Sequence, residues 1–454
     1  MSKRGMRRGP PPSPRPAEFR TLSIESLDSE GRGVARDDGK VVFVEGALPG
    51  ELVEAETTRR GPSFDQAQAV RILRESAGRR EPPCPHFSRC GGCATQHADL
   101  RIQMAAKQRW LEDSLQRIGK VRADVLLPIV YGEEWGYRHR ARMSVRGLPL
   151  PRGALVGFHE RKSSYVADMR QCDNLPPRIS RLIVPLRELV TGMDMRERMP
   201  QVEVAVGDRV DVLVVRNLDP VSEGDAAKLR AFADKEGVWL WLQPKGPATA
   251  APFHPLEMPD LDYTLPEFGL RIAFRPTDFT QVNHGVNRIL VRRAVRMLDP
   301  QPGERIADLF CGIGNFSLPL ATSGATVLGI EGAEDLVERA RSNAAANGLS
   351  AHATFECADL FEVDAQKLAA WGPFDKLLID PPRSGAAELV KALPDEWPSR
   401  IVYVSCDSAT LARDAGMLVS TKGFTLAAAG VVNMFPHTTH VESIALFERG
   451  RPKS

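Results

Sequence analysis

The stretch ERIADLFCGIGNFS, residues 304–317, decides the fold of the C-terminal part of the chain. It joins a short apolar run to a turn with two glycines, which is typical of a strand whose carboxyl end approaches a nucleotide-like ligand. Similar apolar runs follow at residues 326–331, 353–359, 376–380, 400–406, 425–432 and 442–448. Helical segments separate most of these runs, and this alternation predicts an α/β, Rossmann-like domain with a doubly wound, mostly parallel sheet.

Acidic residues close four of the predicted strands: Asp308, Glu331, Asp359 and Asp380. The carboxyl ends of parallel strands line one crevice in an open α/β sheet, so these side chains predict a polar pocket there. A pyrophosphate would be repelled by so many carboxylates, whereas S-adenosylmethionine carries a sulfonium and an ammonium and no phosphate. We therefore expect S-adenosylmethionine rather than NAD as the cofactor.

Two further residues have catalytic chemistry at the same crevice. Cys406 ends the fifth strand just before a helix that starts near Ser408, and a helix N-terminus lowers the pKa of a thiol. Asp407 would act against this effect if its carboxylate lies close to the sulfur. Glu442 is the only acid in the loop of residues 434–443 and is a candidate general base, whereas the two histidines of that loop are expected to be structural.

The chain has 454 residues, enough for about three domains, which excludes a peptide, a single small module and a fibre. The formal net charge is only +2, yet residues 136–162 are rich in Lys and Arg, with Glu160 as the only acid. We find neither a secretory signal nor a run of about 18 apolar residues. We therefore expect a cytoplasmic protein that makes no contact with a membrane.

Four of the seven cysteines have the spacing of a metal centre: Cys84, Cys90, Cys93 and Cys172. An odd number of cysteines without a secretory signal argues against a disulfide framework. Four thiolates suit an iron–sulfur cluster or a structural zinc, and His86 and His97 are alternative zinc ligands, so the residues leave both metals open. Cys311 and Cys357 fall in the C-terminal sheet and are expected to be buried.

The chain divides into four predicted parts. Residues 1–17 are rich in Arg, Gly and Pro and predict a basic disordered tail. Short, partly alternating runs predict an all-β barrel over residues 18–77. Residues 78–274 predict an α+β central domain that contains the metal centre, and residues 275–454 form the α/β domain.

Together these motifs resemble a known family, the RNA uracil C5-methyltransferases, which use S-adenosylmethionine. The matching stretches are FTQVN (279–283), DLFCGIGNFSLPLA (308–321), DPPR (380–383), VSC (404–406), TLARD (410–414) and FPHTTHVE (435–442). The resemblance implies that Cys406 is the nucleophile and Glu442 the base. It also implies that six residues hold the cofactor: Gln281, Phe310, Asn315, Glu331, Asp359 and Asp380. The sequence departs from the family at Asp407-Ser408, where Asn-Pro is common.

The resemblance extends to the N-terminal half of the chain. Residues 19–77 resemble a TRAM domain, an oligonucleotide-binding barrel, through GRGVA (31–35) and VFVEGALPG (42–50). The family includes members whose four cysteines hold a [4Fe–4S] cluster. A TRAM barrel combined with this cluster implies 23S rRNA as the partner. We find no sign of an obligate protein partner in the sequence and expect a monomer. The segment RHRAR (138–142) is a further RNA candidate, because its alternating cations share one strand face.

Two other functions fit parts of the sequence. An exocyclic-amine methyltransferase can also carry an Asp-Pro-Pro motif, but it would not need Cys406. An RNA-binding iron–sulfur or zinc protein with an inactive pocket would bind RNA and transfer no methyl group.

Overall fold

A computed structural model describes residues 18–149 and 151–450, so the expected basic tail at residues 1–17 lies outside the described residues. The chain forms two units, of which the first ends at Arg80 and the second begins at Glu81. Within the described ranges, no helix is long and apolar enough to cross a membrane.

The N-terminal unit is all-β, as predicted. Its six strands lie in the order β1 (Phe19–Ser23), β5 (Leu52–Arg60), β6 (Phe64–Arg74), β4 (Lys40–Glu45), β3 (Gly33–Asp37) and β2 (Ser26–Leu27). Alternate residues of β4 and β5, such as Val42, Val44 and Val53, are buried in the core of this unit. The buried carboxylate of Asp65 accepts hydrogen bonds from Lys40 and Arg20, which lower its pKa to about 2 despite the burial.

The C-terminal sheet confirms the predicted α/β fold. Its eight strands lie in the order β18 (Ala353–Cys357), β17 (Thr326–Glu331), β16 (Arg305–Leu309), β19 (Lys376–Ile379), β20 (Arg400–Ser405), β22 (Glu442–Arg449), β21 (Phe424–Val432) and β7 (Val125–Leu126). The first five are parallel, and β22 runs antiparallel to both of its neighbours. The strand order reverses between β16 and β19, and ligands of such sheets bind at this point.

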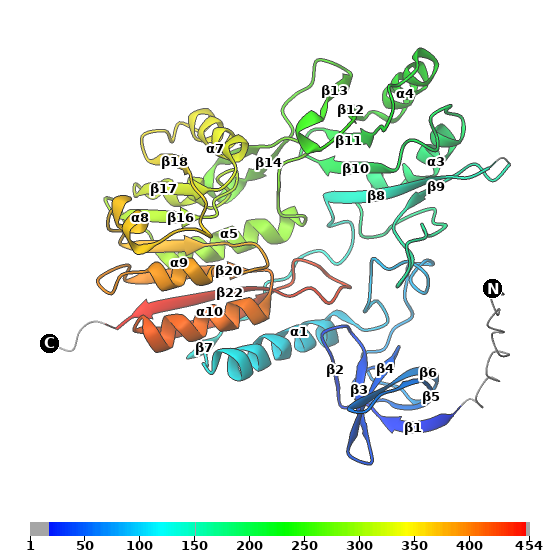
Figure 1. Ribbon diagram of the computed structural model, residues 1–454, viewed down its shortest axis with the longest axis horizontal. Helices are drawn as coiled ribbons and strands as arrows, with labels where there is room; N and C mark the ends of the chain where they lie inside the picture. The colour runs from blue at the N-terminus through cyan, green and yellow to red at the C-terminus, as the bar shows by residue number, and fades with distance from the viewer. Residues whose placement is uncertain (1–17, 150, 451–454) are drawn as a thin grey trace, which may run out of the picture. The chain divides into compact units, whose positions relative to one another are not determined.

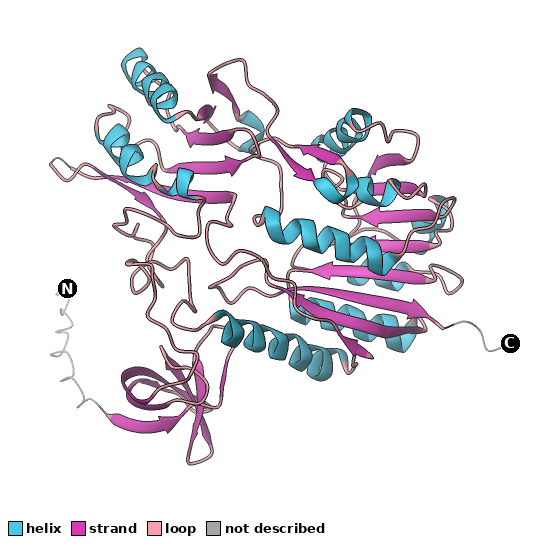
Figure 2. Ribbon diagram, turned by 180° about the vertical axis from the view of Figure 1, so that it is seen from behind, coloured by secondary structure: helices cyan, strands magenta, loops and turns pink. Residues whose placement is uncertain are grey.

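Helices cover both faces of this sheet (Figures 1 and 2). One face packs against α5 (His284–Leu298), α6 (Ser317–Ala321) and α7 (Glu334–Ala346). The other packs against α1 (Leu100–Ser114), α8 (Ala365–Ala370), α9 (Ala387–Ala392) and α10 (Ser408–Thr421). Successive residues of β19 alternate between the two cores, with Leu377 in one and Leu378 in the other. Both α1 and β7 come from residues 78–274, yet they pack on the C-terminal sheet.

A second six-stranded sheet lies between α1 and α5 in the sequence. Its order is β13 (Ala251–His254), β12 (Trp239–Gln243), β11 (Asp211–Arg216), β10 (Gln201–Val206), β8 (Arg140–Gly147) and β9 (Ala154–Gly157). Three helices belong to the same region: α2 (Pro177–Ser180), α3 (Ile183–Thr191) and α4 (Glu223–Glu236). The apolar sides of these helices and strands share one core, which gives this region its α+β character.

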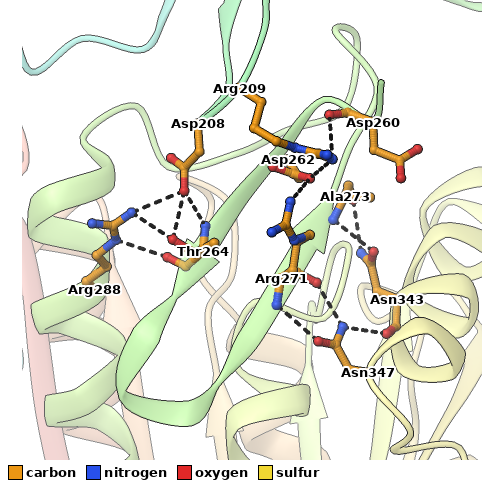
Figure 3. Close-up of polar contacts among 10 residues, drawn as sticks. All are labelled: Asp208, Arg209, Asp260, Asp262, Thr264, Arg271, Ala273, Arg288, Asn343 and Asn347. Carbon is orange, nitrogen blue, oxygen red and sulfur yellow. Dashed lines mark hydrogen bonds and ion pairs between the residues drawn. The ribbon is translucent and has the colours of Figure 1, made fainter. Parts of the chain in front are cut away.

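A hairpin of β14 (Asp262–Leu265) and β15 (Leu270–Ala273) is fastened to two helices of the C-terminal sheet (Figure 3). Asn343 of α7 and Asn347, which caps its C-terminus, exchange hydrogen bonds of 2.8–3.0 Å with the backbone of β15. Arg288 of α5 donates to the carbonyl oxygen of Thr264 at 3.0 Å. These contacts hold the hairpin, and with it Tyr263 of β14, against α5 and α7.

The packing of Phe355 and Cys311 against Gly329 of β17 can be tested by a substitution. A Cβ atom added there would lie 2.5 Å from Cδ1 of Phe355 and 2.9 Å from the sulfur of Cys311. We expect Gly329→Ala to lower the free energy of unfolding by about 1–3 kcal/mol, because overpacked cores must shift. Urea denaturation measures this change. Gly246→Ala is the matched control, since nothing lies within 4 Å of its added Cβ, and equal midpoints for both variants would contradict the packing.

Candidate active site

A cavity of about 500 Å³ opens at the carboxyl ends of the parallel strands. All eight catalytic and cofactor residues inferred from the sequence line it: Gln281, Phe310, Asn315, Glu331, Asp359, Asp380, Cys406 and Glu442. Phe310, Asp380 and Cys406 directly follow β16, β19 and β20. Glu442 begins the antiparallel β22, so its side chain enters from the same edge of the sheet.

The glycine turn after β16 brings the backbone to the cavity. Phe310, Gly312 and Gly314 have φ angles of 65°, 54° and 91°. A left-handed conformation is uncommon for a residue such as Phe310 and typical of functional sites. Glu331 supports the turn, because its carboxylate accepts hydrogen bonds from the backbone N–H groups of Gly312 at 3.1 Å and Gly332 at 2.8 Å.

Asn315 is held by two side chains from other elements. It forms a reciprocal amide pair with Asn287 of α5, at 2.9 and 3.0 Å. The hydroxyl of Tyr263 donates to its Oδ1 at 2.8 Å. Tyr263 also lines the cavity, but the stretch DYTL around it has no motif that the sequence analysis could have used.

Asp308 does not line the cavity, contrary to the expectation of four acids in one pocket. It is the fourth residue of β16, is fully buried, and accepts a hydrogen bond from the hydroxyl of Ser317. Burial raises the pKa of its carboxyl to about 7. The chain turns toward the cavity only at Phe310, so the three other acids remain at the pocket.

The thiol of Cys406 lies in an acidic, half-buried environment. Burial, together with the charges of Glu442 and Asp380, raises its pKa to about 11, and Arg383 opposes this rise. Burial also raises the pKa of Glu442 well above its ordinary range, with Asp380 adding to this effect and Arg383 opposing it. The carboxyl of Asp380 has its pKa raised to about 7 by burial. A cationic ligand in the cavity would favour the ionised form of all three groups.

Asp407 caps the helix that follows Cys406. Its Oδ1 accepts hydrogen bonds from the backbone N–H groups of Ala409 at 2.9 Å and Thr410 at 3.0 Å. This is the ordinary work of an N-cap aspartate or asparagine. The carboxylate is therefore bound to the first turn of α10. Asp407 stands where Asn is common in the family, and it still caps this helix.

Two more lining residues belong to motifs that the sequence analysis quoted without giving these side chains a role. Arg383 of DPPR supplies the positive charge that acts on both Cys406 and Glu442, and its Nη2 lies 3.4 Å from Nδ1 of His440. Phe279 of FTQVN is 70% exposed although it lines the cavity. Its ring offers an apolar surface beside the cavity.

The alternating cations of residues 138–142 share one face of β8 only in part. Arg140 and Arg142 lie on the side opposite the buried Ala141 and Met143. Arg140 donates to the carbonyl oxygen of Asp278, and Arg142 forms an ion pair of 3.0 Å with Glu203. These contacts within the protein engage both guanidinium groups, and RNA binding by this segment stays a prediction.

The four cysteines of the predicted metal centre are all free thiols: Cys84, Cys90, Cys93 and Cys172. Burial raises the pKa of each thiol. The charge of another cysteine of the set contributes to the raised pKa of Cys84, Cys93 and Cys172. The amide of Asn174 donates to the sulfur of Cys93 at 3.2 Å, and the backbone N–H of Gly92 donates to the sulfur of Cys90 at 3.4 Å. Two sulfurs of the set, those of Cys90 and Cys93, thus each have an N–H donor.

Other features bear on the predicted metal centre. Among residues 18–149 and 151–450, no group of three or more His, Cys, Asp or Glu side chains is arranged to hold a metal ion. Nε2 of His86 accepts the backbone N–H of Arg170 at 3.2 Å, which occupies this nitrogen of the alternative zinc ligand. Cys311 is buried, as expected, but Cys357 is exposed because it ends the edge strand β18.

Comparisons with known proteins agree with the fold. Residues 260–450 match the family described as tRNA (Uracil-5-)-methyltransferase, and residues 18–64 match the TRAM domain. The 23S rRNA (uracil(1939)-C(5))-methyltransferase RlmD of Cupriavidus pinatubonensis is 58% identical over 447 residues, which cover 96% of each chain. The protein of the same name from Thiobacillus denitrificans is 61% identical over 429 residues, covering 94% of this chain and 99% of its own.

A solved structure has a similar fold. The tRNA (uracil-54, C5)-methyltransferase of Pyrococcus abyssi, in complex with S-adenosyl-L-homocysteine, superposes with a TM-score of 0.72. The superposition covers 94% of this chain and 100% of that chain at 24% sequence identity.

The raised pKa of Cys406 gives a test of the site's electrostatics. With a pKa of about 11, the thiolate fraction in the cofactor-free protein should rise about tenfold per pH unit between neutral pH and pH ~10. We expect the alkylation rate of Cys406 by iodoacetamide, followed by peptide mass spectrometry, to rise in step without a plateau. Arg383→Met should slow alkylation at each pH. The urea-unfolded protein is the control, and a plateau near neutral pH in the folded protein would contradict this environment.

Proposed function

The chain belongs to the family of 23S rRNA uracil C5-methyltransferases, and on that premise we propose that it methylates the uridine of 23S rRNA that corresponds to position 1939 in its relatives. The methyl donor is S-adenosylmethionine. One observation carries the proposal: a thiol and a buried carboxyl, Cys406 and Glu442, line the same cavity as the residues assigned to the cofactor. An amine methyltransferase would have no use for Cys406, and this favours uracil C5 over an exocyclic amine.

Uracil needs covalent activation because its C5 atom is too weak a nucleophile to attack a sulfonium unaided. We infer that the uridine leaves its base stack to enter the cavity. The thiolate of Cys406 then adds to C6, which forms a C–S bond and moves electron density through C5 to the oxygen at C4. This enolate is the nucleophile for methyl transfer.

The remaining steps balance without a redox partner. C5 attacks the methyl carbon of the sulfonium, the bond between sulfur and methyl breaks, and S-adenosylhomocysteine leaves with that electron pair. Glu442 accepts the proton from C5, and the electrons of the C–H bond expel the thiolate of Cys406 from C6. The products are 5-methyluridine and the free cysteine.

The charges of the cavity suit this order of events. Without a ligand, burial favours the protonated form of Glu442, because it raises the pKa of the carboxyl well above the ordinary range. A sulfonium bound nearby favours the carboxylate, and so does Arg383. A base with a raised pKa also accepts a proton more readily once it is ionised. We infer that the cofactor's positive charge prepares both Cys406 and Glu442.

The six proposed cofactor residues suit different parts of S-adenosylmethionine. Glu331 ends β17, where a carboxylate accepts hydrogen bonds from ribose hydroxyls. Asp380 and Asp359 add negative charge that suits the sulfonium and the ammonium. Phe310 offers an apolar ring beside the glycine turn, and Asn315 and Gln281 offer amides.

We propose that the four cysteines hold a [4Fe–4S] cluster with a structural role. The chemistry of the donor set supports this, because all four cysteines are free thiols, and the sulfurs of Cys90 and Cys93 each accept an N–H group. When bound, the cluster would supply a covalent cross-link between residues 84–93 and Cys172. The methyl transfer derived above needs no electron from it.

The rest of the proposal concerns partners and location. The TRAM unit of residues 18–77 would contact 23S rRNA, and the residues of 78–274 and 275–454 would form the cluster and methyltransferase domains. An enzyme with this substrate would act in the cytoplasm as a monomer.

The role of Glu442 is tested by Glu442→Gln. The amide cannot take the C5 proton, so the methylated base should remain attached to Cys406 and turnover should fall at least about 100-fold. A denaturation-resistant RNA–protein band on ordinary uridine RNA measures this adduct. The double variant with Cys406→Ala is the control and should give no band. Normal turnover by Glu442→Gln would refute the assignment.

The cluster is tested by its colour and metal content. Protein purified without oxygen should absorb visible light near 400 nm and contain about four iron atoms per chain. Cys172→Ser should lose both the absorption and the iron, whereas Cys357→Ser, which changes an exposed cysteine outside the set, should keep them. If the protein is colourless and contains about one zinc per chain, the cluster proposal is wrong and the site is a structural zinc site.

A further inference from the structure

The loop from Asn433 to His440 leads from β21 into the strand that begins with Glu442. Its first residue follows Val432, which is paired with Glu442 across the two strands. The loop also contributes Phe435 to the cavity. Any shift of this loop therefore acts directly on the position of the proposed base.

Gln103 of α1 holds the middle of this loop. Its side-chain oxygen accepts the backbone N–H of His437 at 2.8 Å, and its nitrogen lies 3.2 Å from Nδ1 of the same histidine. The nitrogen also donates to the carbonyl oxygens of Thr95 and Ala98 at 3.2 and 2.9 Å. Only 2% of Gln103 is exposed, so water does not compete for these contacts.

Lys107 lies one helical turn after Gln103, on the same face of α1. Its ammonium donates to Oδ1 of Asn433 and to the carbonyl oxygen of Phe435, both at 2.8 Å. The residue is 1% exposed, and within the described ranges its polar contacts are to neutral oxygens and not to a carboxylate. Burial lowers its pKa to about 7. Burying an ammonium without a carboxylate lowers the stability of the fold. An apolar side chain at this position would make the core more stable.

The segment after Cys93 holds the loop from the other side. The backbone N–H groups of Ala94 and Thr95 both donate to the carbonyl oxygen of His437, at 2.8 and 3.1 Å. The histidine ring stacks on Trp135 with centroids 3.8 Å apart. His437 has a φ of 64°, and such a conformation is unfavourable for a residue other than glycine unless neighbouring groups hold it.

We propose that Gln103 and Lys107 are positioning residues that hold the loop of residues 433–440, and with it the general base Glu442. The two side chains and the backbone of residues 94–95 grip the loop at three points: Asn433, Phe435 and His437. The segment that carries three of the proposed cluster ligands is thereby joined to the base. This inference rests on the proposed function, because it takes Glu442 as the base.

Lys107→Met tests the proposal while nearly keeping the volume of the side chain. A misplaced base should slow the removal of the C5 proton and leave the earlier steps intact. We expect kcat to fall about 10- to 100-fold, with KM for RNA and for S-adenosylmethionine changed by less than about threefold. The methylated adduct with Cys406 should accumulate on ordinary uridine RNA, as a denaturation-resistant band.

Gln103→Leu is the second variant, since it releases His437 and leaves Lys107 in place. It should show the same split between kcat and KM and the same adduct. Arg109→Met is the matched control, because Arg109 lies on the exposed side of the same helix and should behave as the unchanged protein. Calorimetric titration with S-adenosylmethionine reports whether each variant is folded.

The outcomes separate this proposal from the proposed function. Unchanged kcat, or a loss of turnover without adduct, would overturn the positioning role. Loss of cofactor binding in both variants would also overturn it, because the two residues would then serve the core alone. Absence of 5-methyluridine with the unchanged protein would instead reject the proposed function.

Discussion

Asp380, Glu442 and the thiol of Cys406 share one buried cavity, where Asp380 raises the pKa of both other groups and Arg383 opposes it. Such a concentration of groups that lose protons is unfavourable in an empty pocket and becomes favourable when a cation binds. This constraint explains why a sulfonium cofactor suits the pocket and a pyrophosphate does not. It also ties the proposed nucleophile and the proposed base to the same event, since one positive charge favours the ionised form of both.

The fold supplies this arrangement through the sheet edge. Parallel strands end at one side, and the antiparallel β22 begins there, so residues from 310 to 442 meet in one cavity. The support comes from further away. Tyr263 reaches Asn315 from a hairpin held by α5 and α7, and α1 holds the loop before β22. Elements of the central part of the chain thereby complete a site whose reactive groups lie at the C-terminal sheet.

Much of this site follows from the sequence, because strand ends can be read from apolar runs. From the sequence alone, the rule that carboxyl ends line one crevice predicts that Glu331, Asp359, Asp380 and Cys406 share one site. The same rule failed at Asp308, since a strand that is one residue longer turns that side chain into the core. The separate prediction that Cys357 is buried in the sheet was also wrong, because the sequence does not show that β18 is an edge strand. Tyr263 and Lys107 bind residues far away in the sequence, Asn315 and Asn433, and no local sequence pattern predicts such contacts.

The central claim is that Cys406 attacks uracil before the methyl group moves. The most direct test is to incubate the protein, and its Cys406→Ala variant, with S-adenosylmethionine and 23S rRNA fragments containing 5-fluorouridine. Fluorine at C5 blocks the final proton removal, so the reaction should stall as a covalent adduct. The account predicts a denaturation-resistant RNA–protein band that requires both Cys406 and the cofactor. Absence of a band while the protein binds the RNA, or an equal band with Cys406→Ala, would contradict it.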